Sequence, residues 1–334
     1  MKKMTLYGIP IGTLDYYLFK QCTPLIVSFL TTYRCNQHCT YCDWSAQANK
    51  EMNTSQAVSL IEEMKRCHTV KLGFAGGESL IREDVDLLLE CAHKSQMITS
   101  ISTNGRAVPA HIDAIQKYVD VLQVSIDGPE EIHDSLRGKG SYKAAIEAIK
   151  AAKYAKVNVV TNTVLTKITV EHLPYIIDLA KAMDFSVLFQ PAFNYILSAP
   201  NLKIEQLKPS KTQLIQAVDY LRSQKKRHNH VGNSFSFLNY IENNWPAGWL
   251  KKCHASSLFC TLGPCGEVMP CCFAATACEW PNALTDGFKK AFESSINNDF
   301  VKKCKGCYCN AYMEASLIFS LKPEACLNAY KTIN

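Results

Sequence analysis

Between residues 25 and 190, short runs rich in β-branched and aromatic residues alternate with longer segments whose apolar residues recur every three or four positions. The short runs predict strands and the longer segments predict helices. Two runs, LIVSFL at 25–30 and VLQVSI at 121–126, are apolar enough for strands covered on both faces, as parallel strands are. The predicted strands are 25–31, 69–74, 97–102, 121–126, 157–165 and 185–190, and the predicted helices are 54–66, 84–95, 109–118, 141–155 and 171–183.

Six strands separated by helices predict an α/β fold, namely a partial (β/α)6 TIM-like barrel, because the pattern stops after the sixth strand rather than the eighth. After residue 191 the pattern changes to an expected connecting loop at 191–212, a helix at 211–227 and an aromatic-rich stretch at 235–250. We therefore expect an N-terminal extension at 1–24, the barrel at 25–190, a linker and helical segment at 191–250, and a small cysteine-rich C-terminal domain at 251–334.

Composition and charge exclude several classes of protein. The 334 residues are 47% hydrophobic and 20% charged, which excludes disordered, collagen-like and coiled-coil chains. No apolar run approaches the roughly 20 residues of a membrane span, and the N-terminus is a poor signal peptide, so a cytoplasmic protein is expected. The net charge of +6 is a mild excess, and the one dense basic run, 225–228, is interpreted as a solvated helix end rather than a nucleic-acid site.

Sixteen cysteines are the unusual feature of the composition. Three lie within the eight residues 35–42 and ten lie between residues 253 and 326. A disulfide scaffold would be shorter and secreted, so clustered thiols in a reducing compartment indicate metal binding.

The first cysteine group is Cys35, Cys39 and Cys42, directly after the first predicted strand. Active sites of barrels lie at that end of the strands. A closed [4Fe–4S] cluster needs four cysteines, so a cluster held by these three would leave one iron without a protein ligand. A zinc site is the alternative, although three cysteines at this spacing without a pair of histidines are less typical of zinc.

This C-x3-C-x2-C loop resembles the signature of the radical S-adenosylmethionine (SAM) superfamily. Three further segments are similar to that family in order and position: Gly76-Gly77-Glu78 follows the second strand, Ser102-Thr103-Asn104-Gly105 ends the third, and Ser125-Ile126-Asp127-Gly128 ends the fourth. His133-Asp134-Ser135-Leu136-Arg137-Gly138 comes next, as in members with C-terminal cluster domains. Each segment alone is most often only a turn, but four in the family's order are a strong match.

The resemblance implies which residues contact the cofactor. The Gly-Gly-Glu segment would bind the amino group of SAM, since glycines allow close approach and a carboxylate pairs with an ammonium. The third-strand segment would contact the ribose, a serine and the arginine after the fourth strand would hold the carboxylate, and an aromatic side chain would lie beside the adenine. The implied SAM-binding residues are Tyr41, Gly76, Gly77, Glu78, Ser102, Asn104, Ser125, Asp127 and Arg137.

The C-terminal cysteines resemble a second kind of site. Cys253-x17-Cys271, with the G-x-V-x-P-C sequence leading to Cys271, and then Cys304-x2-Cys307 are similar to the twitch form of auxiliary-cluster domain. These four would close one auxiliary [4Fe–4S] cluster. A SPASM domain would hold two, but its C-x5-C-x3-C run is absent; a zinc ribbon is the further alternative. The cysteines without a role are Cys260, Cys265, Cys272, Cys278, Cys309 and Cys326.

The resemblance implies an enzyme that reductively cleaves SAM to a 5′-deoxyadenosyl radical and abstracts a hydrogen atom from a substrate carbon. The 24 residues before the first strand are too few for a peptide-leader-binding domain, which favours oxidation or other modification of a small polar metabolite, sugar-like or a natural product. A peptide-modifying maturase, or an epimerase with a cysteine hydrogen donor, is the alternative; the donor candidates are Cys260, Cys265, Cys272, Cys278 and Cys309.

A flavodoxin- or ferredoxin-type electron donor is the implied partner, and no catalytic residue is assigned. Two non-enzymatic alternatives remain, a two-cluster electron-transfer protein and a zinc-stabilised binding module. The first would need a fourth ligand near Cys42 and would leave the three strand-end segments unused.

Overall fold

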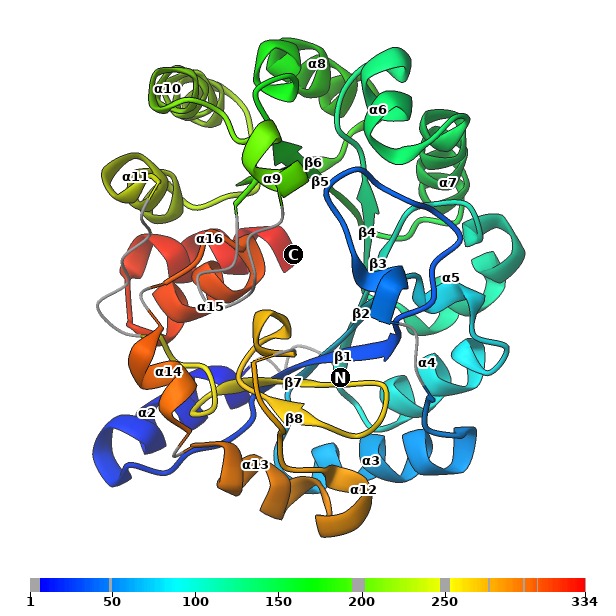
Figure 1. The fold of residues 1–334 in the computed structure, drawn as a ribbon, viewed down its shortest axis with the longest axis vertical. Helices are drawn as coiled ribbons and strands as arrows, with labels where there is room; N and C mark the ends of the chain where they lie inside the picture. The colour runs from blue at the N-terminus through cyan, green and yellow to red at the C-terminus, as the bar shows by residue number, and fades with distance from the viewer. Residues whose placement is uncertain are drawn as a thin grey trace.

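The computed structural model of the chain describes residues 7–47, 50–193, 202–246, 253–275, 277–296, 298–304 and 306–333. Within these ranges, one eight-stranded sheet runs in the order β6-β5-β4-β3-β2-β1-β7-β8 and curves around an interior, with helices outside it (Figure 1). Strands β1 to β6 are all parallel, which confirms the expected α/β partial barrel, and each begins and ends within two residues of its predicted bounds. They are β1 (Ile26–Thr32), β2 (Lys71–Gly76), β3 (Ile98–Thr103), β4 (Val121–Ser125), β5 (Val159–Leu165) and β6 (Ser186–Pro191).

The helices between the strands cover the outer face of the sheet. In α3, Asn53 caps the N-terminus by accepting a hydrogen bond from the backbone N–H of Gln56, and the buried residues recur at helical spacing. One helix, α6 after β4, is not predicted by the sequence pattern, because it is short and mostly polar. The outer helices are α3 (Thr54–Arg66), α4 (Val85–Lys94), α5 (Ile112–Tyr118), α6 (Glu130–Arg137), α7 (Ser141–Tyr154) and α8 (Leu173–Met183).

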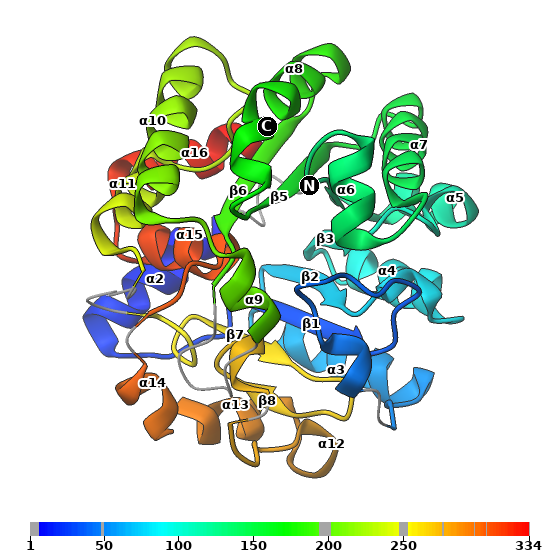
Figure 2. The same cartoon turned by 45° about the horizontal axis from the view of Figure 1, so that its top comes forward.

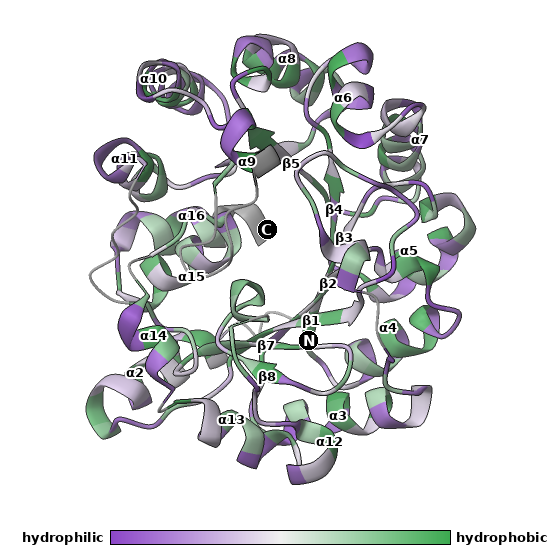
Figure 3. Ribbon diagram, viewed as in Figure 1, coloured by the Kyte–Doolittle hydropathy of each residue, from purple (hydrophilic) through white to green (hydrophobic). Residues whose placement is uncertain are grey.

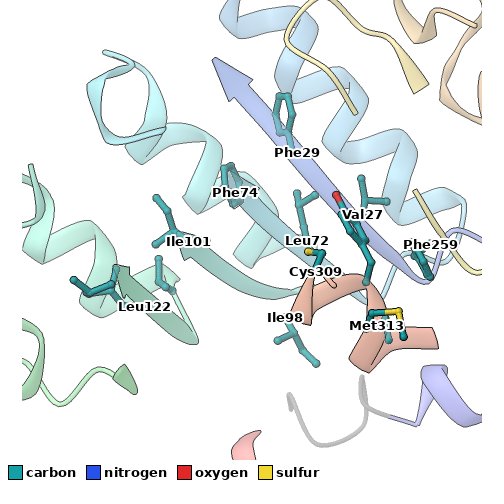
Figure 4. Close-up of a cluster of buried hydrophobic side chains, with 14 of the residues drawn as sticks. Val27, Phe29, Leu72, Phe74, Ile98, Ile101, Leu122, Phe259, Cys309 and Met313 are labelled. Atoms are coloured by element: carbon teal, nitrogen blue, oxygen red, sulfur yellow. The ribbon is translucent and has the colours of Figure 1, made fainter. Parts of the chain in front are cut away.

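The strands alternate between two environments. In β4, Leu122 and Val124 are fully buried beneath the helices, whereas Gln123 and Ser125 are partly exposed on the inner face. Hydrophobic residues concentrate along the strands, and hydrophilic ones lie on the outer turns of the helices (Figure 3). Figure 4 shows the core side chains of neighbouring strands lying in a row, from Phe29 to Leu122.

The cysteine-rich region extends the barrel sheet. β7 (Phe259–Leu262) pairs in parallel with β1, and β8 (Val268–Met269) folds back on β7 as an antiparallel partner. The sheet therefore crosses the boundary expected at residue 251. That boundary and the others remain predictions.

Helices from the second half of the chain fill the gap in the ring between the edge strands of the sheet, β6 and β8 (Figures 1 and 2). The first residue of α15, Asn310, reaches β5 and β6: its backbone N–H donates to Gln190 Oε1 at 3.2 Å and its Nδ2 donates to Asn162 Oδ1 at 2.6 Å. The gap is filled by α10 (Lys211–Arg227), α11 (Phe235–Asn244), α15 (Asn310–Phe319) and α16 (Pro323–Ile333).

The remaining helices lie at the periphery. In α2, part of the expected N-terminal extension, Gly12 lets the helix approach the start of β1, since a Cβ there would lie 2.6 Å from a methyl carbon of Leu25. The expected connecting segment 191–212 lies partly outside the described residues, and its described part includes α9. No helix in the described ranges is long and apolar enough to cross a lipid bilayer. The peripheral helices are α2 (Gly8–Phe19), α9 (Leu202–Leu207), α12 (Ala283–Asp286), α13 (Phe288–Ile296) and α14 (Asp299–Lys303).

Candidate active site

The loop cysteines, Cys35, Cys39 and Cys42, lie at the carboxyl end of β1, as predicted. A hydrogen bond from Thr40 N–H to the Leu136 carbonyl at 2.8 Å holds the loop against α6, and one from Cys42 N–H to the Cys39 carbonyl at 3.1 Å closes a turn within the loop. Burial raises the pKa of all three thiols, to about 11 for Cys42, and the neighbouring thiolates raise the values for Cys35 and Cys42 further.

These three thiols fit an iron–sulfur cluster by the chemistry of the donors. Thiolates this buried and this close repel each other unless a cation compensates them, and coordination to a metal deprotonates a thiol outright. Within the described ranges, no three His, Cys, Asp or Glu side chains meet at a point that could hold a single metal ion. A [4Fe–4S] cluster binds each cysteine through a different iron, so it does not require such a point.

The two glycines of the Gly-Gly-Glu segment allow close contact with the protein's own backbone. Gly77 N–H donates to the Thr32 carbonyl at 2.8 Å, and Glu78 N–H donates to the Arg34 carbonyl at 2.9 Å. A Cβ on Gly76 would lie 2.2 Å from Thr32 O, and one on Gly77 would lie 2.1 Å from Arg34 O. The end of β2 is thus joined directly to the residues that lead into Cys35. The sequence predicted that these glycines allow close approach to SAM, and it did not predict this contact with the protein's own backbone.

Glu78 is fully buried and connects the ends of β2 and β3. Its Oε2 accepts from Asn104 N–H at 2.7 Å and its Oε1 accepts from Leu80 N–H at 3.2 Å. Burial raises its pKa to about 6, although these backbone donors oppose the rise. The carboxylate therefore has a structural role, and its contact with the SAM amino group remains a prediction.

Asn104, at the end of β3, faces the cysteine loop. Its Nδ2 donates to Asn36 Oδ1 at 2.7 Å and lies 3.9 Å from Cys35 Sγ. Ser102 and Ser125 are partly exposed on the inner face of β3 and β4. The structure thus brings the strand-end segments to the same end of the barrel as the loop cysteines.

Asp127, Arg137 and Tyr41 form a buried network beside Cys39. Asp127 Oδ2 accepts from Arg137 Nε at 2.6 Å and from the Tyr41 hydroxyl, while its Oδ1 accepts from Val164 N–H at 2.8 Å. The Arg137 guanidinium lies 5.4 Å from the centre of the Tyr41 ring. Burial raises the pKa of Asp127, but Arg137 and the hydrogen bonds outweigh it and hold the pKa below its usual value. Arg137 is therefore ion-paired through Nε, and the N–H groups of its two terminal nitrogens are the donors that a ligand carboxylate would bind.

His133 was not predicted as a site residue. Its Nδ1 accepts from Asp127 N–H at 3.1 Å, so it positions the Asp127 backbone. Burial and the charge of Arg137 lower its pKa to about 4, which keeps the ring neutral. The only sequence signal was its place in the His133–Gly138 segment.

The auxiliary cysteines, Cys253, Cys271, Cys304 and Cys307, lie close enough for their charges to interact, and their role as cluster ligands remains a prediction. Burial raises the pKa of Cys253, Cys271 and Cys307, and the charges of the other auxiliary cysteines raise it further. As in the cysteine loop, buried thiolates this close repel each other unless a cation compensates them, so the chemistry of these four donors fits a closed cluster.

The structure separates the six leftover cysteines into two sets. Cys272 and Cys309 lie near the auxiliary cysteines: burial raises the pKa of Cys272, and the charges of Cys309 and Cys307 raise it further. The others lie apart: Cys260 is buried in β7, the Cys265 Sγ contacts the Lys50 carbonyl, Cys278 is exposed, and the Cys326 Sγ lies 3.7 Å from the Ile318 carbonyl.

A small apolar cluster connects the two sulfur sites. Tyr33, just before the loop cysteines, stacks on Trp44, just after them, with ring centres 5.2 Å apart. Tyr33 belongs to one buried cluster with Met269 of β8, and Trp44, Cys271 and Cys272 pack against that cluster. The cysteine loop and the auxiliary site therefore share one packed interface.

Comparison with known proteins agrees with these observations. Residues 29–180 match the family described as Radical SAM superfamily. The mycofactocin maturase MftC of Mycobacterium tuberculosis (strain CDC 1551 / Oshkosh) is 29% identical over 273 residues, or 75% of this chain and 65% of that protein. The MftC of Mycobacterium ulcerans (strain Agy99) is 28% identical over 79% of this chain and 73% of that protein. The match thus spans just under two thirds of the length of the tuberculosis relative.

Two solved structures share the fold. Native anSMEcpe with bound AdoMet and Cp18Cys peptide superposes with a TM-score of 0.68 at 19% identity, covering 92% of this chain and 99% of that one. Streptococcus suis SuiB bound to precursor peptide SuiA gives 0.65 at 16% identity, covering 94% and 77%.

The family match coincides with β1 to α8, the part of the chain that holds the loop cysteines and the strand-end segments. The cofactors indicated for this chain are SAM and a [4Fe–4S] cluster, and the C-terminal cysteines fit an auxiliary cluster as well. Residues 29–180, just under half of the chain, are therefore the part that matches the radical SAM superfamily.

Proposed function

We propose that the chain is a radical SAM enzyme that modifies a peptide. The curated relatives are maturases, and two solved structures of the same fold hold a peptide. None of these relatives supports the small polar metabolite expected from the sequence.

The observation that carries the proposal is the chemistry of the barrel's inner face. Consecutive strands each present a partly exposed carboxamide there, Gln123 from β4, Asn162 from β5 and Gln190 from β6, and α15 adds Asn310. A carboxamide offers both N–H donors and a carbonyl acceptor, the same groups that a peptide backbone presents. Such a lining suits a neutral, amide-rich substrate better than a phosphorylated or strongly charged one.

The chain's own residues would bind the cofactors and exclude water. When bound, SAM and the cluster supply a carbon-centred radical that removes hydrogen from an unactivated carbon. The loop cysteines would hold the cluster, and the residues around Glu78, Asn104 and Arg137 would orient SAM beside it. Helices α15 and α16 close the gap in the ring, which limits access of water to the interior. A flavodoxin- or ferredoxin-type protein would supply the electron.

The outcome on the substrate depends on the auxiliary site. If that site accepts an electron, the product is oxidised; if a thiol returns hydrogen, the product is an epimer. Of the five donor candidates, Cys309 is favoured by position, because it is buried and directly precedes Asn310 at the inner face. Turnover in deuterated water distinguishes the outcomes: oxidation gives a product two hydrogens lighter, and epimerisation gives an isomer with one deuterium at carbon.

The proposed function is tested by release of 5′-deoxyadenosine. The anaerobically reconstituted protein receives SAM and dithionite, with or without a low-mass extract of the source cells. We expect slow release alone, faster release with extract, and no acceleration after the extract is digested with a broad-specificity protease. Acceleration that survives digestion overturns the peptide substrate. Release that persists in Cys39→Ala, with Cys278→Ala as the exposed control, overturns the radical SAM activity.

A further inference from the structure

Gln37 lies in the middle of the cysteine loop and is buried, unlike its neighbours. It is 6% exposed, whereas Asn36 and His38 on either side are exposed. Its Oε1 accepts a hydrogen bond from the Cys39 thiol at 3.8 Å. Its Nε2 is buried and has no hydrogen-bond partner within the described ranges. A buried amide nitrogen without an acceptor is uncommon in folded proteins and indicates a missing partner.

The missing partner follows from the state of Cys39. As a thiol, Cys39 donates to Gln37 Oε1; as a ligand to iron it has no hydrogen to donate, and Oε1 would then face a negatively charged sulfur. The terminal torsion of glutamine is broad, so a half turn exchanges Oε1 and Nε2 within the same volume. That rotation gives the unpaired N–H group an acceptor and removes the repulsion at once.

We propose that Gln37 donates a hydrogen bond to the cluster at the Cys39 sulfur and thereby raises the reduction potential of the cluster. This inference rests on the loop cysteines holding a cluster, and not on the identity of the substrate. Hydrogen bonds to cluster sulfurs stabilise the more negative, reduced state, which makes the cluster easier to reduce.

Two side chains from outside the loop also place hydrogen-bond donors near the loop cysteines. The Asn104 amide lies 3.9 Å from the Cys35 sulfur. Arg137 lies close enough to Cys39 to lower its pKa through its charge and a side-chain hydrogen bond, against the larger effect of burial. Arg137 is paired with Asp127 at 2.6 Å, so part of its charge is compensated. Gln37 differs from Arg137 because it is a neutral donor and lies within the cysteine loop.

The test is the midpoint potential of the cluster in Gln37→Leu and Gln37→Glu, from EPR-monitored reductive titration of the reconstituted protein without substrate. The barrel cluster is identified by the change of its signal when SAM is added. Leu keeps the volume and removes the donor, and Glu replaces it with a charged acceptor. The matched control is His38→Ala, at the exposed neighbouring position.

We expect both Gln37 variants to titrate at a more negative potential than wild type, Glu further than Leu, and His38→Ala to titrate as wild type. Unchanged potentials in Gln37 variants that retain wild-type iron overturn the proposal, as does an equal shift in His38→Ala. If Gln37→Leu loses its iron, Gln37→Glu decides alone. A SAM-responsive signal that persists when the loop cysteines are replaced would instead refute the cluster assignment.

Discussion

Replacing Gly77 with alanine tests whether the Gly-Gly-Glu segment is fixed by its contact with the cysteine loop. The added Cβ would lie 2.1 Å from Arg34 O and 2.6 Å from Tyr33 O. Both are backbone atoms that cannot rotate away, so the segment must move. Movement lengthens the hydrogen bonds from Gly77 N–H and Glu78 N–H, now 2.8 and 2.9 Å.

The size of the effect follows from these contacts. Overpacking costs about 1–3 kcal/mol and each of the two lost backbone hydrogen bonds about 0.5–1.5 kcal/mol, so we expect a loss of about 2–6 kcal/mol. With an unfolding entropy of about 2.1 cal/mol/K for each of the 334 residues, that loss lowers Tm by about 3–9 °C. Because Arg34 precedes Cys35, the iron content should fall as well.

The assay is thermal unfolding of the reconstituted protein by circular dichroism, with iron measured on the same sample. Gly73→Ala is the matched control, since its Cβ would lie 3.2 Å from Ser100 Oγ, a side chain that can rotate. It should melt within about 1–2 °C of wild type. A Gly77→Ala protein that melts with wild type and keeps its iron would show that the close approach has no structural consequence.

Three further predictions concern the two clusters and the buried charges. Replacing all three loop cysteines with alanine should leave about half of the roughly eight iron atoms that two [4Fe–4S] clusters hold, by colorimetric assay, and unchanged iron would reject the barrel cluster. Asp127→Asn leaves the buried Arg137 charge without its partner and should cost about 3–5 kcal/mol in urea unfolding; a loss under about 1 kcal/mol would contradict the buried pair. Burial raises the pKa of Glu314 to about 7, so wild type loses stability as pH rises from about 4.5 through 7. Glu314→Gln should therefore be more stable than wild type at pH 8, by about 1–3 kcal/mol, and lose that advantage below pH 4.5, whereas a pH-independent difference would contradict the assignment.

The sequence alone determined the barrel and the site at its carboxyl end. Alternation of apolar runs and helical patterns is a local property, and it placed all six parallel strands within two residues. Parallel strands present their carboxyl ends at one edge, so motifs that each follow a strand had to meet there. The exception was α6, which is only eight residues long and mostly polar, so Ile132 and Leu136 are the only aliphatic side chains that mark it as a helix.

Only the tertiary structure decided the contacts between segments far apart in the sequence. β7 pairs with β1 across more than 200 residues, and a four-residue strand carries no local signal for its partner. The same holds for Asn310 at the inner face and for Cys272 and Cys309 beside the auxiliary cysteines. The backbone atoms that exclude a side chain at Gly77 also come from another strand's loop. Local periodicity fixes which elements form, whereas these positions depend on how the assembled layers pack, and packing is a property of the whole chain.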